Sequence, residues 1–330
     1  MHSDDEGTIR PCVKEYTDAI VALYDRAASV DRGLGPVPRA TWQHFIKLPQ
    51  NQGCRDFRVA QRQGTLIGLA ESSPKDQGER KVRSFKLVVD PSARRQGVGS
   101  ALLLDLLAID QSAANLSLQA LASPDWHAGI AFLSVLGFAH IESEIGMRRQ
   151  RVIQPRPAPP SVIIERAANK TRYAADVARI QNAAFVSDVS FRAVTPQEKA
   201  LELETGELWI ASDEDRVLGF CHLESEEDHV WLENIAVDPS CQTRGFGTAL
   251  ALPALSANGI CPQHPAHLNV SSKNLAAISI YERLGFERHR EKYRYSVPHG
   301  ELVASLSRKW HVPTAKHRNP TKTREGCGEK

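Results

Sequence analysis

The sequence of 330 residues has no long apolar run and no large excess of either charge, and these absences exclude several classes of protein. Its apolar stretches are interrupted by charge, as at Asp105 and Asp110, which argues against a membrane-spanning helix. A net charge of +2 gives no reason to expect nucleic acid or a membrane as a partner. The first residues are acidic and polar, so we expect no signal peptide.

Paired cysteines are also lacking. The six cysteines include no C-x-x-C pair and no metal-ligand spacing. We interpret them as reduced thiols of a cytoplasmic protein that binds no metal. Cys241 lies just before a glycine loop, where a small half-buried residue is a better interpretation than a nucleophile.

One short stretch is present twice, at positions 148 residues apart. In both copies an apolar strand ends in Val-Asp-Pro, a loop with two glycines follows, and an apolar helix opens on Gly97 in one copy and Gly245 in the other. Glycine lets the backbone turn sharply and approach a ligand, and a helix N-terminus offers unpaired N–H groups to an anion. Each loop is therefore a candidate phosphate site.

The repeat also predicts the domain organisation. Residues 88–138 align without a gap on residues 236–286, and each copy ends in Leu-Gly-Phe. A period of this length indicates a duplicated domain. We place one domain at 1–155 and a second at 156–311, with a proline-rich linker between them and a polar, disordered tail at 312–330.

Hydrophobic patterning predicts the same succession of elements in both halves, which defines an α/β fold with a mixed sheet. In the first half we expect strands at 8–13, 57–61, 65–71, 82–90, 116–121 and 139–149, and helices at 15–30, 40–48, 97–109 and 125–136. In the second half we expect strands at 162–166, 207–211, 216–223, 229–237, 266–270 and 288–297, and helices at 171–185, 195–203, 245–255 and 274–284. Residues 75–81 are expected to form a charged turn, and Thr195 to cap a helix.

These motifs resemble the GCN5-related N-acetyltransferases (GNAT), through the V-D-P strand end, the Q/R-x-x-G-x-G/A loop and the L-G-F turn forty residues later. The resemblance covers most of both halves and implies two tandem GNAT domains, each a mixed, mostly antiparallel sheet flanked by helices. The second half is similar to ribosomal-protein N-terminal acetyltransferases. The two-domain layout is similar to mycothiol synthase and to tandem acetyltransferases of antibiotic pathways.

The resemblance implies acetyl-CoA as the cosubstrate, with its pyrophosphate on the glycine loop. The implied binding residues of the second half are Ile235, Ala236, Val237, Gln242, Thr243, Arg244, Gly245, Phe246, Gly247, Thr248 and Asn274. Those of the first half are Val89, Arg94, Arg95, Gly97, Gly99 and Ser100.

Two catalytic residues are expected in the second half. By resemblance Tyr281 would protonate the departing thiolate, and a spacing of seven residues independently places Asn274 and Tyr281 on one helix face, about 10 Å apart. Glu233 is the candidate general base, on the face of Trp231 and Ile235 if the strand alternates regularly. Glu224, His222 and a water relay are the alternatives.

The sequence departs from two relatives of the family. Trp231 stands where mycothiol synthase would carry a glutamate, and Asn269 stands where the ribosomal-protein type would carry one. The two halves also differ, since Asn274 aligns with Trp126 and Tyr281 with Leu133. Leucine cannot donate a proton, so we expect the first domain to be catalytically degenerate, either binding acetyl-CoA or serving as a scaffold.

We therefore expect an acetyl-CoA-dependent N-acetyltransferase that acts, as a monomer or homodimer, on a primary amine of a small-molecule metabolite or antibiotic-pathway intermediate. One alternative is an acetyltransferase of peptide N-termini or lysines. The other is a non-catalytic acetyl-CoA-binding module, which Asn274 and Tyr281 argue against. Residues 181–197 and 289–298 are expected to shape the acceptor pocket.

Overall fold

The computed structural model describes residues 8–31, 33–46, 56–77, 80–110, 115–151, 162–188, 191–213, 216–242 and 245–310. The strands of the first half are β1 (Thr8–Pro11), β2 (Phe57–Arg62), β3 (Thr65–Gln77), β4 (Arg80–Val89), β5 (Leu116–Ala122) and β6 (Ala139–Arg149). Its α-helices are α1 (Thr17–Ala28), α2 (Arg39–Phe45), α4 (Val98–Leu107) and α5 (His127–Val135).

The second half repeats this succession and adds one helix. Its strands are β7 (Ile163–Arg166), β8 (Glu207–Asp213), β9 (Arg216–Ser225), β10 (Val230–Val237), β11 (Ala266–Ser271) and β12 (Glu287–Pro298). Its α-helices are α6 (Ala174–Phe185), α7 (Pro196–Glu202), α8 (Phe246–Ala257), α9 (Leu275–Arg283) and α10 (His299–Trp310).

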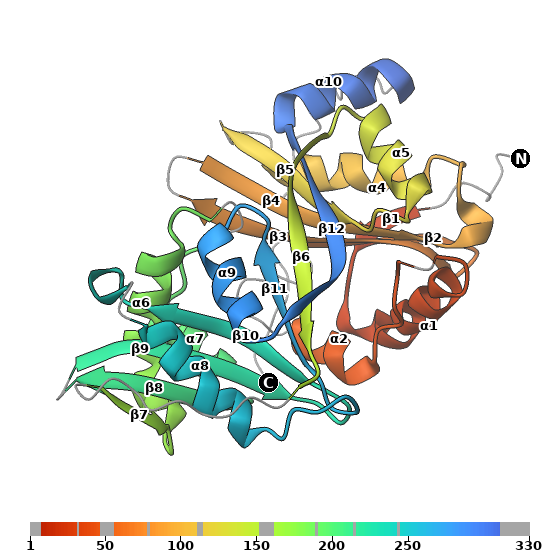
Figure 1. Ribbon diagram of the computed structural model, residues 1–330. Coiled ribbons are helices and arrows are strands. Elements are labelled where there is room, and N and C mark those ends of the chain that lie inside the picture. The colour runs from red at the N-terminus through yellow and green to blue at the C-terminus, as the bar shows by residue number, and fades with distance from the viewer. Residues whose placement is uncertain are drawn as a thin grey trace, which may run out of the picture.

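All the strands of the described residues join one sheet, in the order β1-β2-β3-β4-β5-β12-β6-β11-β10-β9-β8-β7. Neighbours pair antiparallel except for β4 with β5 and β10 with β11, which are parallel. Helices flank the sheet in both lobes (Figure 1). The predicted α/β class, with a mixed and mostly antiparallel sheet in each half, is confirmed.

The two halves exchange their last strands. β12 of the second half lies between β5 and β6, while β6 of the first half lies between β12 and β11. Figure 1 shows β6 and β12 crossing the middle of the molecule between the two lobes. As a result the cores are shared: Tyr295 and Val297 pack in the core of the first half, and Ile145 and Met147 in that of the second.

The glycine loops have the expected geometry. α4 and α8 each begin directly after a glycine with positive φ, 84° at Gly97 and 81° at Gly245, a conformation that costs other residues strain. In each loop an aspartate, Asp90 or Asp238, accepts a hydrogen bond from the backbone N–H two residues later at 3.0 Å. The local sequence is therefore sufficient to specify both turns.

Most of the predicted elements are present, with shifted ends. Thr195 forms a capping box with Glu198 at the start of α7, as predicted. The charged turn expected at 75–81 is wrong, because β3 and β4 pair as far as Gln77 with Arg80. Helix α10 was not predicted, although it buries Leu302 and Leu306 against the first half.

Several sequence-based predictions concern parts of the chain that are not described. The proline-rich linker, with the domain boundary at residue 156, falls within 152–161, and the tail at 312–330 also lies outside the described residues. The boundaries of the two domains therefore stay predictions. Across the described ranges, none of the helices has both the length and the apolar character required to cross a membrane.

Candidate active site

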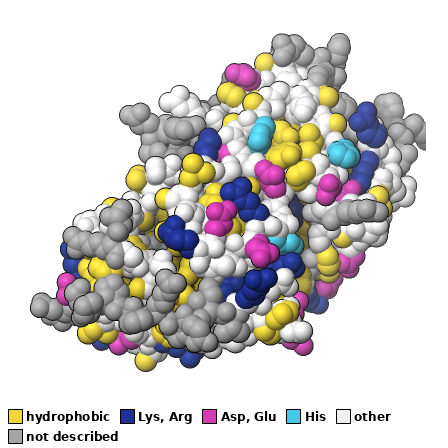
Figure 2. All heavy atoms as spheres, in the orientation of Figure 1, with side chains coloured by type: hydrophobic (Ala, Val, Ile, Leu, Met, Phe, Trp, Pro, Cys, Tyr) yellow, Lys and Arg dark blue, Asp and Glu magenta, His cyan; other side chains and the backbone are white. Residues whose placement is uncertain are grey.

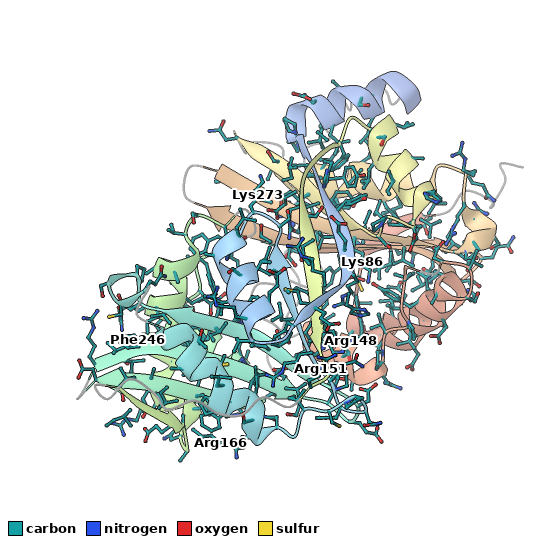
Figure 3. The ribbon with its side chains drawn as sticks, viewed as in Figure 1. Lys86, Arg148, Arg151, Arg166, Phe246 and Lys273 are labelled. Atoms are coloured by element: carbon teal, nitrogen blue, oxygen red, sulfur yellow. The ribbon has the colours of Figure 1, made fainter. Side chains whose placement is uncertain are left out.

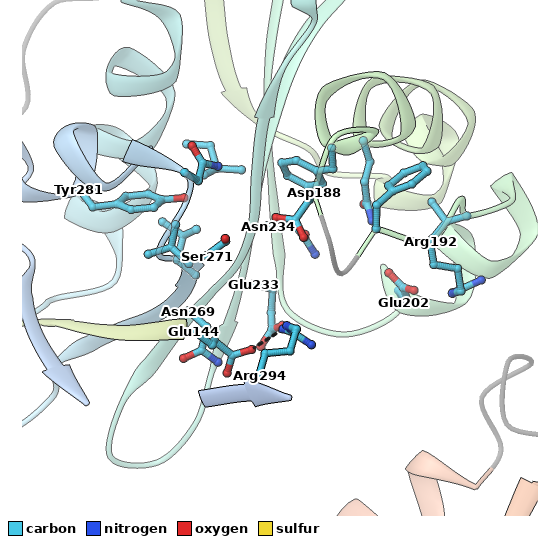
Figure 4. Close-up of a pocket in the computed structure, with 18 residues that line it drawn as sticks. Glu144, Asp188, Arg192, Glu202, Glu233, Asn234, Asn269, Ser271, Tyr281 and Arg294 are labelled. Atoms are coloured by element: carbon cyan, nitrogen blue, oxygen red, sulfur yellow. Dashed lines mark hydrogen bonds and ion pairs between the residues drawn. The ribbon is translucent and has the colours of Figure 1, made fainter. Parts of the chain in front are cut away.

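The site forms where two parallel strands of the second half separate. β10 and β11 pair only at Val230 with Ala266 and at Trp231 with His267, and then diverge. A cavity of about 500 Å³ lies beside the divergent part of β10 (Figure 4). Its lining residues are Glu144, Gln181, Phe185, Asp188, Phe191, Arg192, Val194, Glu202, Leu232, Glu233, Asn234, Ile235, Asn269, Val270, Ser271, Asn274, Tyr281 and Arg294.

Asn274 and Tyr281 both line this cavity, as their spacing predicted. Asn274 is the N-cap of α9, and its Oδ1 accepts a hydrogen bond from the N–H of Ala277 at 3.1 Å. Tyr281 is 9% exposed, and burial, with the neighbouring Cys221, raises the pKa of its phenol. Because the phenol keeps its proton at neutral pH, Tyr281 is suited to act as an acid.

Glu233 also lines the cavity, but through an irregularity that the sequence did not predict. The pairing of β10 with β9 shifts between Leu232 and Asn234, which places Glu233 at a β-bulge. Four consecutive residues from Leu232 to Ile235 consequently reach the cavity, whereas Trp231 does not. The regular alternation expected along this strand is therefore wrong at Glu233.

The environment of Glu233 changes its titration. The pKa of this carboxyl is raised to about 7. Burial is the largest cause, and the nearby carboxylates of Glu224, Glu202 and Glu226 add to it. The residue is nevertheless exposed to solvent, so the carboxyl is only partly removed from water. A carboxyl with a pKa near neutrality can both accept and release a proton at physiological pH.

The two alternative bases do not line the cavity. His222 is buried, with its Nε2 3.2 Å from the carbonyl oxygen of Thr205, and burial lowers the pKa of its imidazole. Glu224 accepts a hydrogen bond from the hydroxyl of Thr205 at 2.6 Å. Of the predicted bases, Glu233 alone is among the lining residues.

The glycine loop of the second half places backbone N–H groups at the start of α8. The first intrahelical bond of α8 runs from the N–H of Ala249 to the carbonyl of Gly245, at 3.0 Å. The N–H groups of Phe246, Gly247 and Thr248 precede it and have no partner within the helix. The side chain of Phe246 is itself buried (Figure 3), so its backbone is the part available to a ligand.

Most of the other cofactor residues predicted for the second half lie in the described part of the chain. Ile235 lines the cavity, whereas the side chains of Ala236 and Val237 are buried. The side-chain amide of Gln242 donates to the carbonyl of Val237 at 3.1 Å and so closes the loop. Thr243 and Arg244 lie outside the described residues.

The glycine loop of the first half has a similar backbone conformation, but the side chain of Arg94 is paired with Asp31. Arg94 donates to both carboxylate oxygens of Asp31, at 2.7 and 3.1 Å, and to the carbonyl of Val89 at 3.2 Å. Arg95 has a positive φ of 62°. Ser100 is buried, and a side chain placed on Gly99 would meet the ring of Phe132 at 3.7 Å. The loop is preserved, but Arg94, which precedes it, is paired within the protein.

The first half also lacks the chemical groups of the second. Leu133, which aligns with Tyr281, is buried in the apolar core. Phe85, which aligns with Glu233, is buried there as well. Trp126 lies over Gly129 beside a cavity of about 280 Å³. Lys86, which follows Phe85 on β4, lies 4.4 Å from the ring centre of Tyr24, whose hydroxyl donates to Glu71.

One lining residue, Glu144, was missed entirely by the sequence analysis. It belongs to β6 of the first half and reaches the second site because β6 pairs with β11. Arg294 comes from the stretch 289–298, and Gln181, Phe185, Asp188, Phe191, Arg192 and Val194 come from 181–197, the two segments expected to shape the pocket. No local sequence signal marks Glu144, since its position depends on pairing between the halves. In the described part of the chain, no group of three or more His, Cys, Asp or Glu residues is arranged to hold a metal ion.

The fold and the glycine loop of each half indicate a transferase, and comparisons with known proteins identify its class. Residues 18–138 match the model of the acetyltransferase (GNAT) family, and residues 204–288 match that of an acetyltransferase (GNAT) domain. The mycothiol acetyltransferase of Actinosynnema mirum is 28% identical over 294 residues, which cover 86% of this chain and 96% of the relative. That of Mycolicibacterium paratuberculosis is 30% identical over 236 residues, which cover 64% and 73%.

Solved structures share the fold of both halves. A tandem GNAT protein from the clavulanic acid biosynthesis pathway superposes with a TM-score of 0.69 at 15% identity, covering 89% of this chain and 99% of that one. A GCN5-related N-acetyltransferase from Sphaerobacter thermophilus gives a TM-score of 0.66 at 15% identity, covering 89% and 96%. The chain belongs to the GNAT acetyltransferase family. It is an N-acetyltransferase with two GNAT domains in tandem.

Proposed function

We propose that this enzyme transfers the acetyl group of acetyl-CoA to the primary amine of a small molecule, and that the reaction takes place in the second half. The observation that carries the proposal is that Glu233, Asn274 and Tyr281 all line one cavity. Figure 4 shows Glu233 and Tyr281 in it. The first half supplies strand β6 and structural support. With Leu133 and Phe85 at the aligned positions, it performs no proton transfer.

The second half fits acetyl-CoA at two places. The free N–H groups at the start of α8 and its positive dipole end favour the pyrophosphate. Beyond Trp231 the edge of β10 that faces β11 is no longer paired, so backbone groups from Leu232 to Val237 are available to the amides of the pantetheine arm. Bound there, acetyl-CoA supplies an activated acetyl thioester.

Two side chains handle the protons. Glu233, with a pKa of about 7, is partly deprotonated at neutral pH and takes the proton that the amine must lose before it attacks. Tyr281, whose pKa is raised, holds the proton that the departing thiolate requires. The strand backbone offers N–H donors for the developing negative charge on the carbonyl oxygen.

A small-molecule acceptor is supported by the size of the cavity and by the relatives. A volume of about 500 Å³ is in the range of small-molecule sites. The chain covers nearly the whole length of a mycothiol acetyltransferase, which favours an acceptor of comparable size. The alternative, a peptide N-terminus or lysine, rests only on the sequence likeness of the second half.

The test is release of free thiol from acetyl-CoA in the presence of a panel of small amines, amino sugars and peptides. We expect turnover with at least one small amine and none with peptides. Tight binding of acetyl-CoA without thiol release from any acceptor would favour the non-catalytic module instead.

A further inference from the structure

The strand exchange brings a carboxylate of the first half into the site of the second. We propose that Glu144 binds the acceptor as a cation, so that the substrate is a primary amine that carries no carboxylate of its own. This inference rests on the proposed function and deepens it, because it names the chemical class of the acceptor.

Glu144 is held at the cavity by pairing on both sides of its strand. On β11 its backbone partner is Ser271, and on β12 its partner is Lys292. Figure 4 shows the side chains of Glu144, Asn269, Glu233 and Arg294 gathered at one end of the cavity, with Tyr281 at a distance from them. The carboxylate of Glu144 therefore lines the same cavity as the candidate base Glu233, in space that an acceptor amine can occupy.

Hydrogen bonding leaves Glu144 only partly neutralised. The Nε of Arg294 donates to Glu142 at 2.7 Å, and both side chains are buried, at 7% and 1% exposure. Glu142 also accepts from the hydroxyl of Ser271 at 2.8 Å. The contact between Arg294 Nη2 and Glu144 is longer, at 3.4 Å, and among the described residues it is the one ion pair of Glu144 within 4.0 Å. The guanidinium of Arg294 thus contacts two carboxylates, and it lies closer to that of Glu142.

The charged residues that line the cavity also have a net negative charge. Four carboxylates, on Glu144, Asp188, Glu202 and Glu233, stand against two guanidinium groups, on Arg192 and Arg294. Two ion pairs with residues outside the lining leave this count unchanged, since Arg192 pairs with Glu198 at 2.8 Å and Glu202 pairs with Lys199.

A partly buried excess of negative charge is costly unless a cation compensates it. An alkylamine arrives at neutral pH as an ammonium ion, which supplies that charge and donates to Glu144. A free amino acid would bring a carboxylate into the same cavity and be repelled. Glu144 therefore selects the protonated amine, which Glu233 then deprotonates.

The experiment compares two probes of nearly equal size, L-alaninamide and L-alanine, by calorimetric titration into the full-length protein saturated with CoA. We expect the wild type to bind L-alaninamide and to bind L-alanine at least tenfold more weakly. E144Q should bind L-alaninamide roughly ten- to a hundredfold more weakly, the effect of losing one charge-assisted hydrogen bond. E291Q, at an exposed carboxylate of β12 outside the cavity lining, is the matched control and should bind as the wild type does.

Affinity for acetyl-CoA should be unchanged in E144Q, which separates a local effect from misfolding. Equal binding of the two probes, binding of neither by the wild type, or an E144Q variant that binds L-alaninamide as well as the wild type would each overturn the inference. Because the titration uses CoA and needs no turnover, it is independent of the thiol-release test. Binding that depends on Glu144 without turnover would refute the proposed function alone.

Discussion

Lys292 lies opposite Glu144 in the pairing of β12 with β6, and these two residues are 148 residues apart, the same spacing that separates the two glycine loops. The pair therefore marks the position about which the two halves are related, and the exchanged strands meet there. Figure 2 shows basic, acidic and histidine side chains gathered over the middle of the molecule, where β6 and β12 run in Figure 1.

The first prediction concerns Tyr281. Y281F should lower kcat at least about a hundredfold, because the departing thiolate loses its proton donor, while the affinity for acetyl-CoA changes little. Y293F, which removes a hydroxyl from β12 outside the cavity lining, is the control and should keep wild-type activity. Steady-state thiol release measures both, and a Y281F enzyme with normal kcat would remove Tyr281 from the mechanism.

The second prediction is a pH dependence set by Glu233. Because its pKa is raised to about 7 and the base must be deprotonated, kcat/KM should rise with pH and level off above about 8. E233Q should lower activity and abolish this dependence. A profile that is already flat between pH 6 and 8 in the wild type would contradict the assignment.

The third prediction is an effect of the raised pKa of Glu233 on the stability of the fold. The folded protein favours the protonated form of Glu233, so this residue lowers the stability of the fold as the pH rises from its ordinary carboxyl pKa to about 7, and the loss is complete above that pH. E233Q should therefore raise Tm at pH 8 and change it less at pH 5. Thermal melts of the two proteins at both pH values check the sign.

The fourth prediction separates the two glycine loops. G247E places a carboxylate at the start of α8, where the pyrophosphate would bind, and it should weaken the binding of CoA at least tenfold through charge repulsion. G99E makes the matched change in α4, where a side chain meets only ordinary contacts with Phe132 and Val89. It should leave turnover intact, and the reverse result would move the chemistry to the first half.

The fifth prediction tests the strand exchange. A chain ending at residue 151 lacks β12, so it leaves β5 without its neighbour and removes Tyr295, Val297 and Leu302 from the core of the first half. We expect this fragment to aggregate or to melt without a cooperative transition, because an unpaired edge and an open apolar core are both exposed. A monomeric fragment with a sharp thermal transition would show that the first half folds without β12.

Much of the fold could be predicted because its signals are local. Positive-φ glycines, the capping box at Thr195 and the spacing from Asn274 to Tyr281 depend on a few neighbouring residues, and the structure reproduces them. The β3–β4 hairpin is longer than predicted, because its charged residues still pair as far as Gln77 with Arg80. Helix α10 was not predicted, because its apolar residues are buried only by packing against the first half.

The sequence by itself determined that two acetyltransferase folds are present, and it predicted that Tyr281 of the second one is the proton donor. Its repeat and its turn chemistry act over short distances, where backbone conformation follows from residue type. Only the tertiary structure decided that β6 and β12 change places, that a bulge turns Glu233 into the cavity, and that Glu144 of one half serves the site of the other. The pairings of β6 with β11 and of β12 with β5 and β6 join residues that are more than a hundred positions apart, and their energy comes from a shared core and sheet that no local pattern records.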